Sequence, residues 1–404
     1  MPLRSNCLAC NSKLLDKIID LGSHCFADRF IDKKIFEVSD PTYTLSCSIC
    51  KNCGFIQNDL ITNPEDRYIQ VDYSYTAANS SYSINHWREY SSTCITYHGG
   101  SISSVLEIGS NDGTLLTAFK EIDPTLQLTG VDASPKMVEI CKEKNFDTHL
   151  DIFGSNDGEY LKDKKYDLVL ANNVLNHSDS PINFLSLAKR KLKNKQSLII
   201  FELPYWKCLV DDKRFDQIYH EHVSYFTIHN SRNLLSTIGL EINHVEINNY
   251  HGGSLRVFCS IKDNRAINSS VKKYLNKESL SNLRSLSTYE KLNSVIKMNK
   301  IKVVKKILNA NLDNRKVICI GAAAKANTLL TYYGLDKSIV NFITDSSPYK
   351  IGKYTPLTRI PILPDSAIKD IHNPLCLITS WNIGEILKQK ILEINPTAEI
   401  ILPH

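Results

Sequence analysis

The sequence predicts an α/β protein in which a small cysteine-rich domain precedes two Rossmann-like units. Two Cys-x-x-Cys pairs stand near the start of the chain, about forty residues apart. From residue 104 onward, strand-sized apolar runs alternate with helical segments, which is typical of a parallel, doubly wound sheet. A second strand-then-glycine unit begins at residue 316 and indicates a smaller α/β domain at the C-terminal end.

The cysteine pairs predict a structural zinc site. They are Cys7 with Cys10 and Cys50 with Cys53. Two intervening residues let both thiolates of a pair point the same way, and four thiolates make a tetrahedral site. Disulfides and plain buried thiols are the alternatives. Cys47 competes as a ligand, but Gly54 after Cys53 suits the tight turn of a zinc knuckle and favours Cys50.

The predicted elements follow the apolar pattern. In the first α/β unit, strands are expected over 104–108, 128–132, 166–171 and 197–201, and a closing hairpin over 240–245 and 254–261. Polar and aromatic residues over 71–100 predict a loop that leads into a helix. Leucines at near-helical spacing over 264–313 predict a helical connector. In the second unit, strands are expected over 316–321, 340–345 and 375–379.

The bulk composition is that of an ordinary soluble protein. The chain has 404 residues, 42% of them hydrophobic and 23% charged, which allows two or three domains. A net charge of +5 is too weak to argue for nucleic acid and suits a diphosphate-bearing small molecule equally well. No apolar run has the roughly 20 residues of a membrane helix, and the chain opens without a signal segment. We therefore expect a cytoplasmic protein without a membrane or nucleic-acid partner, for which a monomer is plausible.

The turn after the first strand has the features of a cofactor site. It contains Glu107, Gly109, Ser110, Asn111, Asp112 and Gly113. Small residues let the backbone approach a ligand closely at the carboxyl edge of a sheet. Asp132 ends the next strand, where a carboxylate can accept hydrogen bonds from both hydroxyls of a ribose. The pattern is not GxGxxG and favours S-adenosylmethionine (SAM) over NAD, although a generic βα turn would explain it too.

Five longer motifs, in the right order, resemble the nucleotide-sugar C-methyltransferases. They are EIGSNDGTLL over 107–116, NNVLNH over 172–177, FDQIYHEH over 215–222, HGGSLR over 251–256 and GAAAKANTLL over 321–330. The resemblance spans the chain and implies a zinc-binding domain over 1–70 and a SAM-dependent methyltransferase domain over 71–262. It also implies a helical connector with a nucleotide-sugar-binding α/β domain over 263–404. The implied reaction methylates a sugar carbon next to a ketone, on a dTDP-linked 4-keto-deoxyhexose or a related nucleotide sugar.

Tyr219-His220-Glu221-His222 is dense in proton-transfer groups. A carbon nucleophile needs a base held against a weakly acidic C–H bond and a donor for the developing enolate oxygen. Histidine suits the first task near neutral pH, and a tyrosine hydroxyl or a second histidine suits the other. A second metal site at the two histidines and a packed structural cluster are the alternatives.

The resemblance assigns roles to these residues and to others. It implies that His222 is the general base, and that Tyr219 and Glu221 bind or orient the sugar and the base. His177 would contact the keto sugar, and Tyr75, or else Tyr73, would cover it. Asn172 and Asn173 would border the cofactor, and His220 is expected to be structural. The implied reaction is proton abstraction followed by in-line attack of the enolate carbon on the SAM methyl.

The second unit shows a weaker anion-binding signal. Backbone N–H groups at a helix start and a lysine favour a diphosphate, although a packing turn explains them too. The resemblance implies substrate binding by Gly321, Lys325, Asn327, Asp345 and Lys350. Ala322 replaces an aromatic residue often found in this family, and Leu357 stands where relatives usually have glycine. The second departure leaves the nucleotide's identity open.

Further function classes stay open on the sequence alone. A zinc-ribbon RNA methyltransferase would need a basic stripe, for which Lys297, Lys300, Lys302, Lys305 and Lys306 are the best candidates. Their helical spacing is explained more simply by a solvated helix face. Methylation of oxygen or nitrogen on a nucleotide sugar stays open as well, as does NAD-dependent oxidation of such a sugar.

Overall fold

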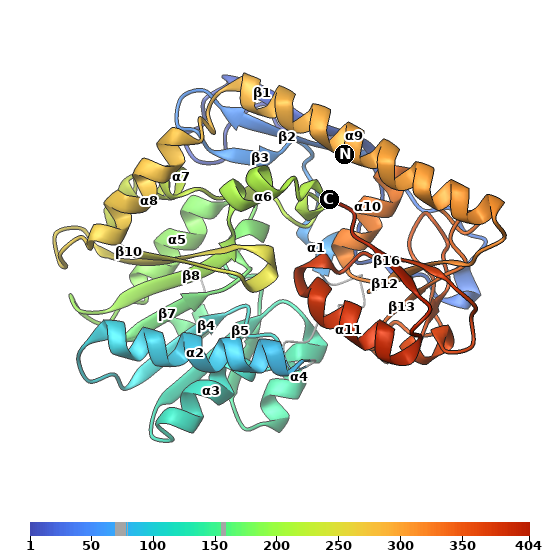
Figure 1. Cartoon of the computed structure of the whole chain (residues 1–404). Helices are drawn as coiled ribbons and strands as arrows, with labels where there is room; N and C mark the ends of the chain where they lie inside the picture. Colours follow the sequence, from blue (N-terminus) through green and yellow to red (C-terminus); the bar gives the residue numbers. More distant parts are fainter. Residues whose placement is uncertain (69–77, 79, 155–158) are drawn as a thin grey trace.

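The computed structural model describes residues 1–68, 78, 80–154 and 159–404 and arranges them around three sheets (Figure 1). The predicted order of a small N-terminal domain, a large α/β unit and a second α/β unit is confirmed. The predicted substrate-covering residue Tyr75 and its alternative Tyr73 lie outside the described residues.

The N-terminal sheet is antiparallel, with the strand order β1-β2-β3-β9. Its strands are β1 (Leu15–His24), β2 (Tyr43–Cys50), β3 (Ile56–Asn58) and β9 (Ser224–Tyr225). The last strand comes from the middle of the chain and pairs Tyr225 with Ile56, shortly after the end of the Tyr219–His222 run. The N-terminal domain is therefore completed by the segment that follows the predicted base.

The central sheet has seven strands in the order β10-β11-β8-β7-β4-β5-β6, and β11 runs antiparallel to both of its neighbours. Its strands are β4 (Ser104–Ile108), β5 (Gln127–Asp132), β6 (Asp147–Leu150), β7 (Leu168–Ala171), β8 (Leu198–Pro204), β10 (Leu240–Asn248) and β11 (Ser254–Ile261). The predicted strands and the closing hairpin are confirmed, whereas the short β6 was not predicted. Side chains of β4 alternate between two cores, because Leu106 and Ile108 face one side of the sheet and Val105 the other.

Helices cover both faces of the central sheet (Figure 1). They are α2 (Ser81–His98), α3 (Thr114–Ile122), α4 (Pro135–Glu143), α5 (Pro181–Arg190), α6 (Trp206–Asp212) and α7 (Ile228–Ser236). The predicted helix through His86 and Trp87 is α2, which ends at Gly99 in the left-handed conformation with a φ of 72°. None of the helices in the described ranges is both long and apolar enough to cross a membrane.

The C-terminal sheet is fully parallel, in the order β14-β13-β12-β15-β16. Its strands are β12 (Val317–Ile320), β13 (Phe342–Thr344), β14 (Ile362–Leu363), β15 (Leu375–Ile378) and β16 (Glu399–Ile401), and its helices are α10 (Ala324–Tyr333) and α11 (Gly384–Ile394). The predicted connector consists of α8 (Ser269–Leu280) and the long α9 (Leu286–Leu312). Figure 1 shows α9 running from the N-terminal sheet to the C-terminal unit.

The three regions pack against one another. Ile18 of β1, Leu292 of α9 and Val317 of β12 belong to one buried cluster. A loop of the N-terminal domain also reaches the C-terminal unit, where Ile31 forms a bridge with Tyr354. This packing brings side chains from all three regions to one cavity.

Candidate functional site

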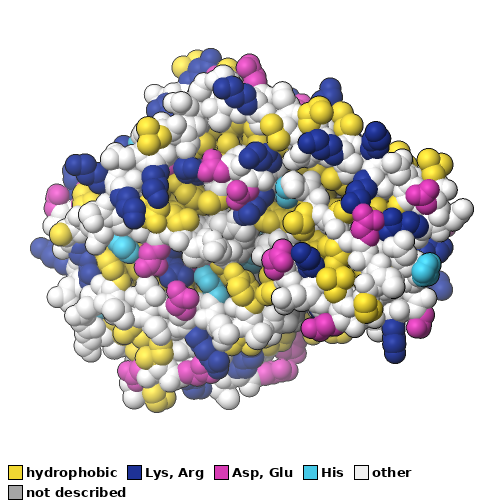
Figure 2. All heavy atoms as spheres, viewed as in Figure 1, with side chains coloured by type: hydrophobic (Ala, Val, Ile, Leu, Met, Phe, Trp, Pro, Cys, Tyr) yellow, Lys and Arg dark blue, Asp and Glu magenta, His cyan; other side chains and the backbone are white. Residues whose placement is uncertain are grey.

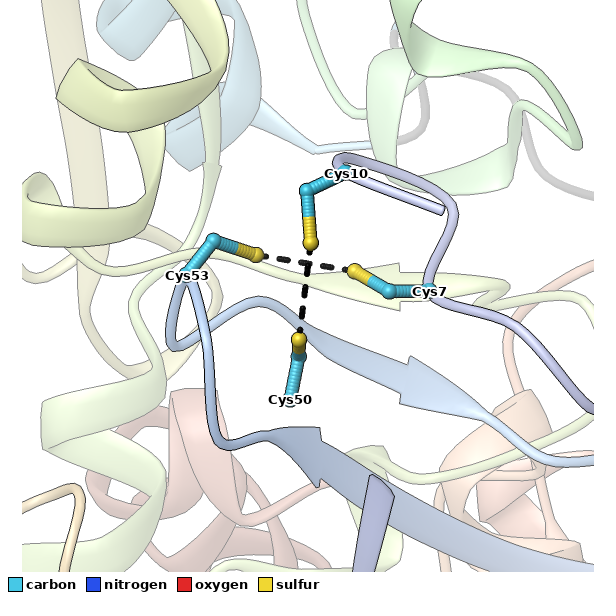
Figure 3. A group of neighbouring side chains, drawn as sticks. All are labelled: Cys7, Cys10, Cys50 and Cys53. Carbon is cyan, nitrogen blue, oxygen red and sulfur yellow. Dashed lines mark hydrogen bonds between the residues drawn. The ribbon is translucent and has the colours of Figure 1, made fainter. Parts of the chain in front are cut away.

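The four predicted zinc ligands converge (Figure 3). All four Sγ atoms lie within 4.8 Å of one another, with Cys7 3.5 Å from Cys53 and Cys10 3.6 Å from Cys50. Tetrahedral Zn²⁺ with Zn–S bonds of about 2.3 Å would place its sulfurs about 3.8 Å apart, so the thiols fit the metal. Cys47 is fully buried on β2 and lies outside this group. The structure therefore groups Cys50, and not Cys47, with the other three predicted ligands.

The turn after β4 is shaped for close approach. Gly109 and Gly113 have φ values of 74° and 76°, and Asn111 has a φ of 47°. A Cβ at Gly109 would lie 3.0 Å from Val174, so a larger residue would crowd the turn. Asp132 holds the turn by accepting the backbone N–H of Asn111 at 2.8 Å.

A cavity of about 450 Å³ adjoins this turn and receives side chains from all three regions. Of the predicted cofactor residues, Glu107, Gly109, Ser110, Asn111 and Asp132 line it, together with Asn172 and Asn173. Of the predicted catalytic residues, His177, Tyr219, Glu221 and His222 line it. Of the predicted substrate residues, Lys325 and Lys350 line it. The cavity therefore joins the cofactor wall to the C-terminal unit.

Five predicted site residues do not line the cavity. They are Asp112, Gly113, Gly321, Asn327 and Asp345. The Asn327 amide donates to the carbonyl of Ala27 at 2.5 Å, which ties the C-terminal unit to the N-terminal domain. Gly321 packs so closely that a Cβ there would lie 2.1 Å from the Ser380 hydroxyl.

The cofactor wall is acidic. Burial, together with the nearby charges of Asp112 and Asp132, raises the pKa of Glu107 well above its usual value. Asp151, which follows β6, also lines this wall. Carboxyl groups here fit the ribose hydroxyls and the positive sulfonium of SAM, whose charge would favour their ionised form. Asp151 was missed because β6 is too short to show a clear apolar pattern.

His222 is oriented by one hydrogen bond. Its Nδ1 lies 2.8 Å from the backbone carbonyl of Gln217. A carbonyl only accepts hydrogen bonds, so Nδ1 carries the proton, and Nε2 is the basic nitrogen of the neutral ring. Burial lowers the pKa of His222 to about 4, so the ring is neutral at physiological pH. This is the protonation state that a general base requires.

Other proton-transfer groups surround this ring. The ring centroid of Tyr219 lies 3.9 Å from that of His222, and that of His177 lies 5.0 Å from it. Burial lowers the pKa of His177 well below its usual value, so that imidazole is also neutral. Glu221 accepts the backbone N–H of Asp28 at 3.1 Å, and burial together with the Asp28 charge raises its pKa to about 7.

His220 lies outside this group. It is buried, its Nε2 lies 3.2 Å from the carbonyl of Thr44, and it is not among the residues that line the cavity. This position agrees with a structural role. It also separates His220 from His222, although the two residues are only two positions apart in the sequence.

The C-terminal wall is basic. Lys325 lies in the first turn of α10, donates a hydrogen bond to the side chain of Asn382, and has its pKa lowered to about 8 by burial. Lys350 donates to the carbonyl of Ala322 at 2.8 Å and lies 3.8 Å from the carboxylate of Asp345. Two amines on one side of the cavity suit an anionic group such as a diphosphate.

Several lining residues were not predicted. Asp28 and Arg67 come from the N-terminal domain, and Gln217 and His251 come from the motifs over 215–222 and 251–256. Arg67 is 2% exposed and pairs with Asp179. Gln217 and His251 lie within two of the motifs quoted above, so the sequence could have marked them as candidate site residues. Asp28 and Arg67 sit in a loop and a five-residue helix, where no periodic pattern marks them.

Comparison with known proteins agrees with this architecture. Family models match in order along the chain: a putative zinc-binding domain over 7–68, a methyltransferase domain over 83–245 and a C-methyltransferase C-terminal domain over 249–403. The C-methyltransferase NovU of Streptomyces niveus is 25% identical over 381 residues, which cover 93% of this chain and 89% of that protein.

Solved structures match part of the chain. The plantazolicin methyltransferase BpumL, in complex with a pentazolic desmethylPZN analog and SAH, is 17% identical, covers 50% of this chain and 92% of its own, and has a TM-score of 0.37. Magnesium protoporphyrin IX methyltransferase (ChlM) from Synechocystis PCC 6803, with bound SAH, is 16% identical, covers 44% of this chain and 83% of its own, and scores 0.34. Scores this low carry no argument about function. The three domain models, matched in order along one chain and joined by the NovU likeness, show that this protein belongs to the SAM-dependent C-methyltransferase family.

Proposed function

We propose that this protein methylates the carbon next to the ketone of a nucleotide-diphosphate-linked 4-keto-deoxy sugar. The observation that carries the proposal is the setting of His222. Its basic Nε2 belongs to a buried ring that lines a cavity with an acidic cofactor wall and a basic C-terminal wall. A base in this position suits removal of a weakly acidic C–H proton near a bound methyl donor.

Each named residue has its own role in the proposed reaction. His222 Nε2 takes the proton from the sugar carbon, and the Gln217 carbonyl holds the resulting imidazolium through Nδ1–H. The Tyr219 hydroxyl or the neutral His177 donates to the enolate oxygen. Lys325 and Lys350 hold the diphosphate. SAM, when bound, supplies the electrophilic methyl group.

The nucleotide-sugar substrate is supported by two features. The C-terminal unit contributes two half-buried lysines, Lys325 and Lys350, to the same cavity as the base, which suits a substrate with an anionic arm. The motifs over 215–222, 251–256 and 321–330 resemble those of the nucleotide-sugar C-methyltransferases. An RNA substrate is less well supported, because Figure 2 shows basic and acidic side chains interspersed on the face in view.

Mass spectrometry of candidate substrates tests the proposal. A dTDP-linked 4-keto-6-deoxyhexose, deuterated at the carbons next to the ketone, is incubated with the protein and SAM. We expect a gain of one methyl group with loss of deuterium at the methylated carbon. GDP- and UDP-linked sugars extend the panel, and an RNA pool is tested in parallel.

Each contrary outcome is distinct. A methyl gain with both neighbouring carbons still fully deuterated would show methylation of oxygen. Methylation of RNA with none of the keto sugars would overturn the substrate class. His222→Gln serves as the control, because equal product formation by that variant would show that His222 is not the base.

A further inference from the structure

A chain of contacts runs from the C-terminal unit to His222. Gln217, whose carbonyl accepts the His222 Nδ1–H, ends the 3₁₀ helix η5 (Phe215–Gln217). Asp216, the residue before it, is fully buried, and its carboxylate accepts the indole N–H of Trp381 at 2.5 Å. Trp381 opens the 3₁₀ helix η8 (Trp381–Ile383) of the C-terminal unit. This hydrogen bond links the C-terminal unit to the turn that orients the base, and His404 Nε2, also from the C-terminal unit, lies 3.3 Å from the other carboxylate oxygen of Asp216.

The Trp381 ring is held in place on several sides. The Arg214 guanidinium lies 4.5 Å from its ring centroid, and the Lys325 amine lies 4.6 Å from it, both at cation–π distance. Gly252 packs against the ring so closely that a Cβ would lie 2.3 Å from a ring carbon. With its ring fixed, the indole can hold Asp216 in one position.

The turn is also held from the methyltransferase side. The Gln217 side-chain amide donates to the carbonyl of His251 at 2.8 Å. His251 has a φ of 50°, a conformation that costs a non-glycine residue energy and persists only where the surroundings impose it. The neighbouring Gly252, against which Trp381 packs, belongs to the same turn. The C-terminal unit and the methyltransferase unit therefore both contact the turn at Asp216 and Gln217.

We propose that Trp381 is a positioning residue for the base, an inference that rests on the proposed function. Its indole N–H fixes Asp216, and this keeps the Gln217 carbonyl where it holds His222 as the Nδ1–H tautomer. The Lys325 amine, which would meet the diphosphate, lies on the same indole ring. The C-terminal unit, docked against the turn, therefore contributes to the orientation of the base.

Nitrogen NMR of protein labelled with ¹⁵N-histidine tests this inference without any substrate. The parent should show His222 as a single Nδ1–H tautomer, its signal identified by its loss in His222→Gln. Trp381→Phe removes the N–H donor and keeps an aromatic ring, and we expect it to give mixed His222 tautomers. Trp206→Phe is the matched control, because it removes another indole hydrogen bond, to the Tyr289 hydroxyl at 3.1 Å, which involves neither Asp216 nor Gln217.

Activity gives the second readout. With the keto sugar, Trp381→Phe should lower kcat about 10- to 100-fold while the KM for SAM stays within about twofold, since misplacement of a catalytic group costs this much. Trp206→Phe should keep the parent's kcat. Asp216→Ala removes the acceptor of the same hydrogen bond. If the two residues act through each other, the double variant is no slower than the slower single variant.

The results separate this inference from the proposed function. An unchanged His222 tautomer and an unchanged kcat in Trp381→Phe would overturn the positioning role, and so would additive losses in the double variant. If no keto sugar is methylated, the proposed function fails, whereas the tautomer comparison still decides whether Trp381 positions His222. Should Trp381→Phe not fold, Asp216→Ala gives the same comparison by both readouts.

Discussion

The two α/β units of this protein share a topology but present different ionisable groups to the cavity between them, carboxyl groups from the central unit and amines from the C-terminal unit. Numbered within each unit, five strands follow the order 3-2-1-4-5 in both the central and the C-terminal sheet. In each unit, the first strand ends at a glycine with positive φ, Gly109 at 74° and Gly321 at 94°. Each unit also uses a carboxylate after its second strand to hold that turn, as Asp345 does by accepting the N–H of Ala322 at 2.9 Å.

The difference lies in the side chains that follow the glycine. The central unit adds the buried Asp112 and exposes Glu107 and Asp132 to the cavity, whereas the C-terminal unit adds alanines and the half-buried Lys325. Strand order and turn geometry therefore do not select the ligand. The ionisable groups placed at the edge of the sheet differ instead, and under the proposed function they suit a sulfonium cofactor in the central unit and a diphosphate in the C-terminal unit.

The largest effect is expected where the two units meet. His222→Gln removes the base and should lower methyl transfer by a factor on the order of 10² to 10⁴. The central wall stays intact, so SAM binding measured by calorimetry should remain within about threefold of the parent. Near-parental methyl transfer by this variant would show that the base lies elsewhere in the cavity.

The same variant changes the pH dependence of stability. The pKa of His222 is about 4 in the folded protein, below the ordinary histidine value of about 6.5, so the unfolded chain takes up a proton there first. This contribution is fully present above pH 6.5 and is lost as the pH falls toward 4. Its size is on the order of 3 kcal/mol. Urea unfolding at pH 7 and pH 5 should show a smaller difference for His222→Gln.

Removal of zinc tests the N-terminal domain, which belongs to neither α/β unit. Cys50→Ser should release the metal and cost several kcal/mol of folding free energy, since structural zinc sites stabilise small domains directly. Because β9 follows His222 and pairs with β3, methyl transfer should fall together with stability. SAM binding should persist. Cys47→Ser, on the same strand but outside the cluster, is the control, and equal zinc content in both variants would contradict the site.

A pair of substitutions tests the charge difference itself. Asp132→Asn should weaken SAM binding about 10-fold and leave binding of dTDP unchanged. Lys325→Met should weaken dTDP binding about 10-fold and leave SAM unchanged, because charge-assisted hydrogen bonds contribute about 1.5–3 kcal/mol each. Calorimetry with each ligand checks both. A loss of both ligands in either variant would mean that the two walls do not act independently.

The smallest effect is expected at Leu357, which stands where members of the resembled family usually have glycine. This residue has a φ of 60° and is 37% exposed, so a side chain is strained there and contributes little burial. Leu357→Gly should raise the free energy of unfolding by about 1 kcal/mol. Ile386→Gly, in the first turn of α11 and 52% exposed, should lower it by up to about the same amount. A loss of stability in Leu357→Gly would show that the leucine side chain makes a stabilising contact.

Local patterns in the sequence determined much of this protein. Spacing alone identified Cys7, Cys10, Cys50 and Cys53, because two residues between thiolates suffice to bend a chain round a metal. Apolar runs located the main strands of both units, and leucine spacing located the connector α8–α9. These features are encoded within a few turns or a few residues, so the sequence records them directly.

Only the tertiary structure decided which side chains share the cavity. β9 has two residues and no periodicity, and it joins the N-terminal sheet because Ile56 is brought beside Tyr225. Asp28 reaches the cavity, whereas Asn327 is turned away to bind the Ala27 carbonyl. These placements depend on contacts between segments up to about 300 residues apart, as between Ala27 and Asn327. No local pattern specifies such contacts, since they form only when three separately encoded regions pack together.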